Sequence, residues 1–253
     1  MPYPRLIPCL DIGGGRVVKC IRFEDRRDVG DPVELASAYS EGGADELVLL
    51  DIEATVEGRA TLLDVVRRVA DSIDIPFTVG GGLRRVEDAS AFVESGADRV
   101  SLNTAAIADP DLITELARRY GSQAVVVAID VRGGVVYSHA GTRPTTLDAA
   151  TWARRAEECG AGEILLTSID ADGTRFGYDI AMTRRVVAAV NVPVIASGGA
   201  GTAEHVAGVL RVADAALVAS IVHDDPSQLP RLRQAVSACG IELRPAAQGA
   251  ARV

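Results

Sequence analysis

Eight short apolar runs, each followed by a longer amphipathic segment, constrain the fold of this chain more than any other feature. The runs are RLIPCLDI, ELVLLDI, IPFTVG, RVSLN, AVVVAID, EILLTSI, VPVIASG and AALVAS. Continuous apolar character is typical of strands buried on both faces of a parallel sheet. The intervening segments space apolar residues three and four apart, as helices do. The alternation predicts a (βα)8 barrel, the TIM barrel. The alternative is an open doubly wound sheet, although no G-x-G-x-x-G motif follows the first run.

A second periodicity, of about half the chain length, overlies the first. GGADELVLLDI matches CGAGEILLTSI, so that Glu46 aligns with Glu163, 117 residues later. TVGGGLR matches IASGGAG, GADRVSLNTA matches VADAALVASI and ADPDL matches DDPSQ at nearly the same spacing. A simple βα unit recurs at about 30 residues, so the longer spacing indicates a duplicated half-barrel. We predict one domain over 1–253, with half-barrels at about 1–120 and 121–240 and a C-terminal tail at 241–253.

Length, composition and charge narrow the class of protein. With 253 residues, 48 % of them hydrophobic, the chain is long enough for one large core. Its net charge of −9 argues against general binding to nucleic acid or to anionic membranes. The sequence has no run of 18 apolar residues and no signal-peptide pattern at its N-terminus. The cysteines show no C-x-x-C spacing and are typical of reduced thiols, so we expect a cytoplasmic protein.

Two aspartates end corresponding strands of the two halves. Asp11 closes the first run and Asp130 the fifth, and a glycine-rich stretch follows each. Chemistry in such barrels takes place at the carboxyl ends of the strands, so the duplication places the two carboxyls on opposite sides of one mouth. A helix cap or a salt bridge is the alternative role for each. The pairing favours acid/base catalysis.

Two glycine-rich strand ends, each paired with the end of the next strand, predict two anion sites. The first combines Gly81 and Gly82 with Asn103 and Thr104, and the second combines Gly199 and Ala200 with Ala219 and Ser220. Glycine lets backbone N–H groups approach an anion closely. Glycines often only turn the chain, but the repetition favours binding. The arrangement predicts a long substrate with a phosphate at each end and its middle between the two aspartates.

Together these residues give the chain a specific resemblance to the cyclase subunits of imidazole glycerol phosphate synthase, a family of histidine biosynthesis. It covers residues 5 to about 223 and rests on PCLDIGGGRVVK, GDPVELA, GADELVLLDI, DIPFTVGGG, NTAAI, GSQAVVVAID, GAGEILLTSIDADGT, GYD and VIASGGAG. The resemblance implies a twofold-symmetric barrel that uses ammonia to convert a bisphosphorylated phosphoribulosyl-formimino aminoimidazole carboxamide ribotide. The products are imidazole glycerol phosphate and an aminoimidazole carboxamide ribotide. A glutaminase subunit supplies the ammonia in a heterodimer, and no metal or cofactor is implied.

The resemblance also implies roles for individual residues. Asp11 and Asp130 become the acid/base pair, which moves protons as ammonia condenses, a C–N bond breaks and a ring closes. Lys19 lies in a segment, 13–31, that we expect to be flexible and to close over the anionic substrate. The other expected site residues are Asp51, Thr167, Asp172 and Gly173, the last as a backbone donor to the second phosphate. Asp51 is expected either to orient Lys19 or polar groups of the substrate, or to form a structural hydrogen bond.

Four charged residues stand at the opposite ends of the runs. Arg5, Glu46, Arg99 and Glu163 each begin an apolar run. Charges that enter the bottom of a barrel need partners, and two arginines with two glutamates can form a closed ring. By resemblance this ring gates the entry of ammonia, although the family usually has lysine at position 99. The alternative is an ion ring that only stabilises the fold.

The chain departs from the family pattern near the mouth. Cys20 and Arg22 stand where the family has glycine and asparagine, Thr146 replaces a glycine, and SIVHDDP, with Asp224, replaces SVFHFRE. These differences leave the closing of the first loop and the exact substrate open. The alternatives are the isomerase of the same pathway, which acts without ammonia, and a cyclase-like paralogue of another nucleotide pathway. The motifs and the charged ring favour the cyclase.

Overall fold

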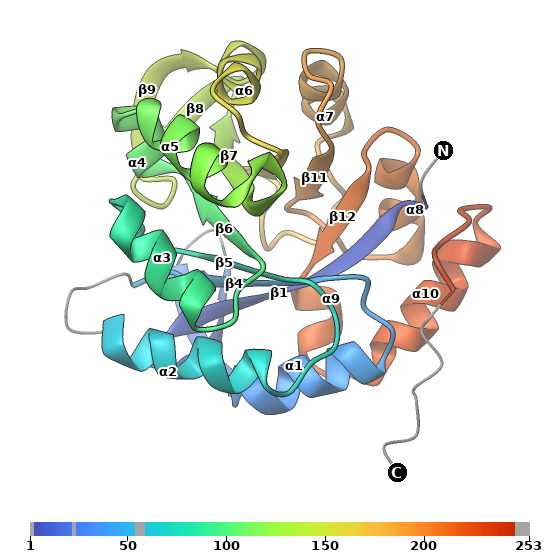
Figure 1. Ribbon diagram of the computed structural model, residues 1–253. Helices are drawn as coiled ribbons and strands as arrows, with labels where there is room; N and C mark the ends of the chain where they lie inside the picture. Colours follow the sequence, from blue (N-terminus) through green and yellow to red (C-terminus); the bar gives the residue numbers. More distant parts are fainter. Residues whose placement is uncertain (1–2, 22–23, 54–58, 246–253) are drawn as a thin grey trace.

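The computed structural model describes residues 3–21, 24–53 and 59–245, and eight parallel strands in this part form a closed barrel (Figure 1). The barrel strands are β1 (Arg5–Gly13), β4 (Leu47–Asp51), β5 (Phe77–Gly80), β6 (Arg99–Leu102), β7 (Val125–Arg132), β10 (Glu163–Ser168), β11 (Val194–Ser197) and β12 (Ala215–Val218). Each pairs with the next in this order, and the β6–β7 and β12–β1 pairings join the two halves into a closed barrel. The predicted (βα)8 barrel is confirmed.

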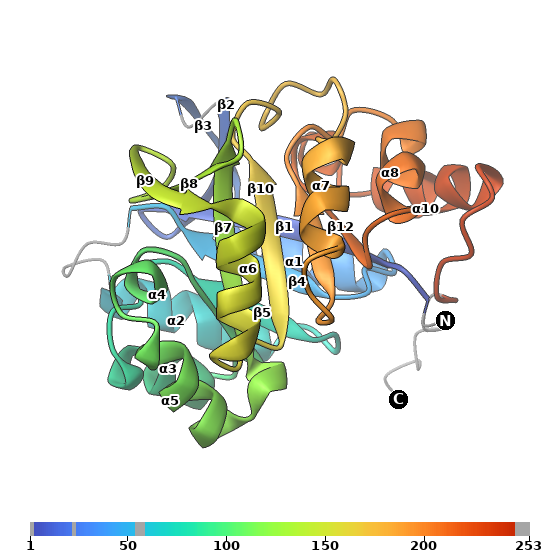
Figure 2. The same ribbon diagram turned by 90° about the horizontal axis from the view of Figure 1, so that it is seen from above.

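Helices surround the strands, as Figures 1 and 2 show. They are α1 (Pro32–Glu41), α2 (Arg59–Ala70), α3 (Val86–Glu94), α4 (Thr104–Ala108), α5 (Asp111–Tyr120), α6 (Ala149–Glu158), α7 (Ile180–Val187), α8 (Ala203–Leu210), α9 (Ser220–His223) and α10 (Gln228–Ala238), with a 3-10 turn at Ser122–Ala124. Local sequence fixes their starts: the Asp31 carboxylate accepts the backbone N–H of Val33 at 2.9 Å, and Pro32 occupies the first turn of α1. None of the described helices is long and apolar enough to cross a membrane.

The two halves repeat each other in backbone geometry. Asp31 and Asp148 precede α1 and α6 with φ/ψ of −77/130° and −79/136°. Arg85 and Thr202 precede α3 and α8 with φ/ψ of −143/166° and −143/167°. Both pairs are separated by the 117 residues of the sequence repeat. The duplication therefore extends to single cap residues.

Each half also carries a β-hairpin that the sequence reading did not anticipate. Strands β2 (Arg16–Ile21) and β3 (Glu24–Gly30) follow β1, and β8 (Val135–Ser138) and β9 (Arg143–Asp148) follow β7 (Figure 2). In the segment that we expect to be flexible, 13–31, the described residues form the first hairpin, in which β2 pairs antiparallel with the end of β1. Gly14 and Gly15, with φ of 58° and 78°, form the turn. Two successive residues of positive φ match the twist of a two-residue hairpin.

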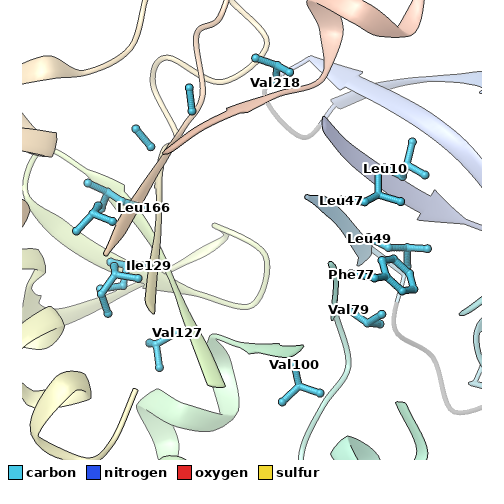
Figure 3. Packing of buried hydrophobic residues seen from close by; sticks show 14 of the residues in the cluster. Leu10, Leu47, Leu49, Phe77, Val79, Val100, Val127, Ile129, Leu166 and Val218 are labelled. Atoms are coloured by element: carbon cyan, nitrogen blue, oxygen red, sulfur yellow. The ribbon is translucent and has the colours of Figure 1, made fainter. Parts of the chain in front are cut away.

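The core has two layers, one on each face of the strands. The outer layer packs the strands against the helices, and the strand residues labelled in Figure 3 belong to it. The inner layer fills the barrel with Ile7, Cys9, Val48, Val126, Leu165, Ile195, Ala215 and Leu217. Alternation along each strand assigns its side chains to the two layers, as the pleat requires. The same alternation points Arg5 and Asp11 into the barrel interior at opposite ends of β1.

A buried ion pair fastens α10 to the amino end of the barrel. Arg233 donates to the Asp45 carboxylate at 2.8 Å, and that carboxylate also accepts the backbone N–H of Leu6 at 2.8 Å. Arg233 donates further to the carbonyl of Arg244. Both charges are buried, so the pair is satisfied only in this docked position. The contact ties the C-terminal segment to strands β1 and β4.

Candidate active site

A cavity of about 740 Å³ opens at the carboxyl ends of the barrel strands. Ten of the predicted site residues line it: Asp11, Asp51, Gly81, Gly82, Asn103, Thr104, Asp130, Thr167, Asp172 and Ala219. Five others, Lys19, Gly173, Gly199, Ala200 and Ser220, are not in its lining. The cavity therefore brings together both predicted catalytic aspartates and the first predicted anion site.

Strand and hairpin together position the two aspartates. Asp11 pairs with Val18 and Asp130 with Tyr137, so each aspartate sits where a barrel strand begins its hairpin. The thiol of Cys9 donates to the Asp11 carboxylate with an S–O distance of 3.7 Å. The side-chain amide of Asn103 donates to the Asp130 carboxylate at 2.8 Å. Each carboxyl thus keeps an oxygen free of these contacts.

Three carboxyl groups with raised pKa values face the cavity. Burial, together with the negative charge of Asp172, raises the pKa of Asp11 to about 7 and that of Asp130 to about 7. Burial also raises the pKa of Asp172 to about 6, against the lowering effect of the Gly173 N–H. Such coupled groups share protons near neutral pH. One carboxyl can therefore donate a proton while another accepts one.

At Gly81, in the first predicted anion site, the neighbouring backbone leaves no room for a side chain. Gly81 has a φ of 103°, and a Cβ on it would lie 2.2 Å from the carbonyl oxygen of Asp51. Next to it, the Thr104 hydroxyl accepts the backbone N–H of His139 at 2.8 Å and keeps its own hydrogen to donate. The Asn103 Oδ1 atom is buried and has no hydrogen-bond partner among the described residues. These groups leave donors and an unsatisfied acceptor beside the cavity.

The second predicted anion site is built from three chain segments. A Cβ on Gly199 would lie 2.0 Å from the carbonyl oxygen of Gly177, whose N–H donates to the Gly199 carbonyl at 2.8 Å. A Cβ on Gly201 would likewise lie 2.0 Å from the Arg175 carbonyl oxygen. Only glycine therefore fits at positions 199 and 201, where this loop passes the 171–177 loop.

The strand ends that complete the two predicted anion sites have the same backbone shape. Asn103, before α4, has φ/ψ of −125/−85°, and Ala219, before α9, has −134/−82°. A hydroxyl residue follows each, Thr104 in the first site and Ser220 in the second. The two sites are therefore copies of one local structure, as the repeat predicted.

Lys19 lies on β2 and points to the second site rather than to Asp51. Its side chain is 17 % exposed, and Nζ lies 3.3 Å from Oδ2 of Asp224. The suggested pairing of Lys19 with Asp51 is not among its salt bridges, and Asp51 instead accepts the backbone N–H of Glu53 at 2.9 Å. Of the departures from the family pattern, Thr146 is exposed on β9, whereas the Cys20 side chain and Arg22 lie outside the described residues.

The four charged residues at the amino ends of the strands form the predicted closed ring. Arg5 and Arg99 each donate to Glu46 at 2.8 Å, Arg99 donates to Glu163 at 3.0 Å, and Arg5 donates to Glu163 as well. The glutamate side chains are only 6–7 % exposed. Burial raises the pKa of Glu163 although Arg5 and Arg99 act against it. The ring covers the end of the barrel opposite the cavity.

Sequence reasoning missed several polar residues of the cavity, namely Glu53, Arg84, Asp109, Ser197 and His139. The backbone is most unusual at His139. It follows β8 and has a φ of 53°, and both it and Ala140, with a φ of 51°, line the cavity. Left-handed backbone at two successive non-glycine residues is strained and often marks a functional site. The hairpin after β7 brings this turn over Thr104, so the position depended on an element that the sequence did not reveal.

Comparisons with known proteins agree with this geometry. The family model for "Histidine biosynthesis protein" matches residues 5–227. Imidazole glycerol phosphate synthase subunit HisF of Sulfurisphaera tokodaii is 54 % identical over 248 residues, which cover 96 % of this chain and 100 % of the relative. The same subunit of Metallosphaera sedula is 55 % identical over 250 residues, with 96 % and 100 % covered, and that of Synechococcus sp. (strain CC9902) is 53 % identical over 254 residues, with 95 % and 98 % covered. The chain therefore belongs to the HisF family, the cyclase subunits of imidazole glycerol phosphate synthase in histidine biosynthesis.

Proposed function

We propose that Asp11 and Asp130 are the acid/base pair of the cyclase reaction on a substrate with two phosphates. The observation that carries this proposal is the pair of carboxyls, both with a pKa of about 7, on corresponding strands of the two halves of one cavity. The alternative roles, a helix cap or a salt bridge, do not match their side-chain contacts, which are a thiol for Asp11 and a side-chain amide for Asp130. A pKa near the working pH gives an acid or base its best efficiency.

In this proposal the protonated carboxyl serves the first half of the reaction. Ammonia attacks the ketone of the ribulosyl end, and the resulting hydroxyl leaves as water after it takes a proton from the protonated carboxyl. The ionised carboxyl accepts the proton that the attacking nitrogen releases. Breaking of the C–N bond and closing of the imidazole ring then move protons between the same two groups. The negative charge of Asp172 helps one of the two carboxyls to stay protonated, because it raises the pKa of both Asp11 and Asp130.

The two glycine-rich sites are proposed to hold the two phosphates. Support comes from the equal backbone conformations of Asn103 and Ala219. It comes also from the glycine loops, which leave no room for a Cβ atom at positions 81, 199 and 201. Backbone N–H groups of the loops, with the hydroxyls of Thr104 and Ser220, would donate to phosphate oxygens. A substrate held at both ends would cross the mouth with its middle between Asp11 and Asp130.

Ammonia is proposed to come from a glutaminase subunit that docks on the amino ends of the strands. Support comes from the closed ring, which stands at that end on the barrel axis. Above the ring, Thr78 and Ser101 are buried polar residues, and Ser101 and Ala128 also line the cavity. These small side chains would line the route of ammonia from the ring to the aspartates. Such a heterodimer of a biosynthetic enzyme fits the cytoplasm.

The test measures loss of the substrate's absorbance with the purified protein and an ammonium salt. Asp11→Asn and Asp130→Asn are each expected to lower kcat at least about 100-fold, the usual loss for a missing general acid or base. KM should change little, because the phosphates are held elsewhere. Asp170→Asn, at an exposed rim carboxylate paired with Arg132 at 3.0 Å, is the matched control. Near-normal turnover of either active-site variant would refute the assignment of that residue.

A further inference from the structure

Three charged side chains from separate segments meet beside the second predicted anion site. Asp224, just after α9, lies with Oδ2 at 3.3 Å from Nζ of Lys19 and at 3.1 Å from Nη2 of Arg175. Lys19 belongs to the β2–β3 hairpin, and Arg175 to the loop between β10 and α7. One carboxylate thus joins two cations that lie far apart in the sequence.

Both cations belong to the surroundings of the second anion site. The backbone of Arg175 forms the wall against which Gly201 packs, and its guanidinium also donates to the carbonyl of Ser220. Lys19 is mostly covered, with 17 % of its side chain exposed, while the Asp224 side chain is 53 % exposed. The Arg175 side chain is 45 % exposed, so the carboxylate and the guanidinium both face solvent, and the carboxylate can swing away without uncovering a core.

We propose that Asp224 is an internal competitor for the phosphate of the second site and so sets the affinity of the enzyme for that end of its substrate. The proposal rests on the proposed function, because it takes the second site to bind a phosphate. A carboxylate and a phosphate use the same donors, namely the ammonium of Lys19 and the guanidinium fork of Arg175. Binding of the phosphate would then require these two cations to exchange one anionic partner for another.

The charge state of Asp224 agrees with a competing role. Hydrogen bonds from Arg175 and Lys19 lower the pKa of its carboxyl and outweigh the raising effect of partial burial. It is therefore ionised at neutral pH and holds both cations. Because the pair is largely solvated, its attraction is modest, and a phosphate that carries more charge and more acceptor oxygens can replace it. Asp224 stands within the segment in which this chain departs from the family pattern, so the competition would distinguish it from relatives without a carboxylate there.

The decisive variant is Asp224→Asn, which keeps the shape of the side chain and removes its charge. KM is expected to fall about twofold to fivefold, the scale of a solvated ion pair, with kcat changed less than about twofold. Asp225→Asn is the matched control, since it removes the same charge one residue later, where the carboxylate accepts the backbone N–H of Ser227 at 3.0 Å. A KM that rises in Asp224→Asn, or that equals the value of Asp225→Asn, overturns the proposal.

Binding of inorganic phosphate, measured by calorimetry, provides a readout that does not need turnover. Asp224→Asn should tighten phosphate binding by a similar factor, and the gain should shrink in an Arg175→Gln background, where one of the contested donors is gone. An equal gain in both backgrounds would mean that only the general field of the charge matters, and it would overturn the proposal. If the unaltered protein lacks cyclase turnover yet binds phosphate with this pattern, the proposed function fails while the competition stands.

Discussion

Replacing Asp130 with asparagine should stabilise the protein while it removes activity. The Asp130 carboxyl has a pKa of about 7 in the folded protein against 3.8 as an ordinary aspartate. A difference of about 3 pKa units corresponds to a cost of about 4 kcal/mol for ionising this group in the folded state at pH 8. Water in the cavity and sharing of protons with Asp172 reduce this figure, so we expect a gain of about 2 kcal/mol. Asparagine keeps the hydrogen bond, since its side-chain oxygen accepts the Asn103 amide in place of the carboxylate.

The pH dependence of this gain follows from the direction of the shift. Because the folded pKa of Asp130 is raised, the unfolded chain loses its proton at lower pH, and the folded state loses stability as pH rises from about 4 to about 7. The asparagine variant lacks this loss. Its advantage should therefore be largest at pH 8 and fall to about a quarter of that value near pH 4.5, where the folded carboxyl is still protonated and the pH lies less than one unit above the unfolded pKa of 3.8.

Urea unfolding measures the difference directly. The single tryptophan, Trp152, is buried and reports unfolding by its fluorescence. With an m value of about 3 kcal/mol/M, a gain of 2 kcal/mol raises the midpoint by about 0.7 M at pH 8. Asp170→Asn at the exposed rim is the control and should show no pH-dependent gain. A loss of stability at pH 8, or the same gain at pH 4.5 and pH 8, would refute the account of a carboxyl held at a raised pKa.

Two further predictions concern the ring and the second predicted anion site. Arg99→Ala should impair glutamine-dependent turnover in the complex with the glutaminase, or let ammonia leak, while activity with an ammonium salt stays nearly intact. Arg99→Lys is the conservative control. Equal losses of activity in the two assays would leave the ring a purely structural network. Gly199→Ala should raise KM at least about tenfold, since its Cβ would lie 2.0 Å from the Gly177 carbonyl oxygen and the loop must move. Gly208→Ala in α8 meets nothing within 4 Å and should leave the kinetics unchanged, so similar KM values for the two variants would contradict the steric argument.

The local sequence by itself determined the barrel strands, the twofold repeat and the position of the two aspartates. The apolar runs predicted the eight barrel strands because strands buried on both faces can carry few polar residues, and the 117-residue repeat predicted two like halves down to single cap residues such as Asp31 and Asp148. Position at a strand end was enough to bring Asp11 and Asp130 into one cavity, because all parallel strands of a barrel end at the same face.

Only the tertiary structure decided which side chains contact one another around these residues. The pairing of Lys19 with Asp224 joins positions that are 205 residues apart, and no local pattern records it. The sequence did not predict the hairpins, because a pair of glycines is equally typical of an irregular loop. The contact of His139 with Thr104 in turn depends on the hairpin that carries His139. The raised pKa values also depend on the fold. Aspartate is acidic in any chain, and only burial beside a third carboxylate raises the pKa of Asp11 to about 7.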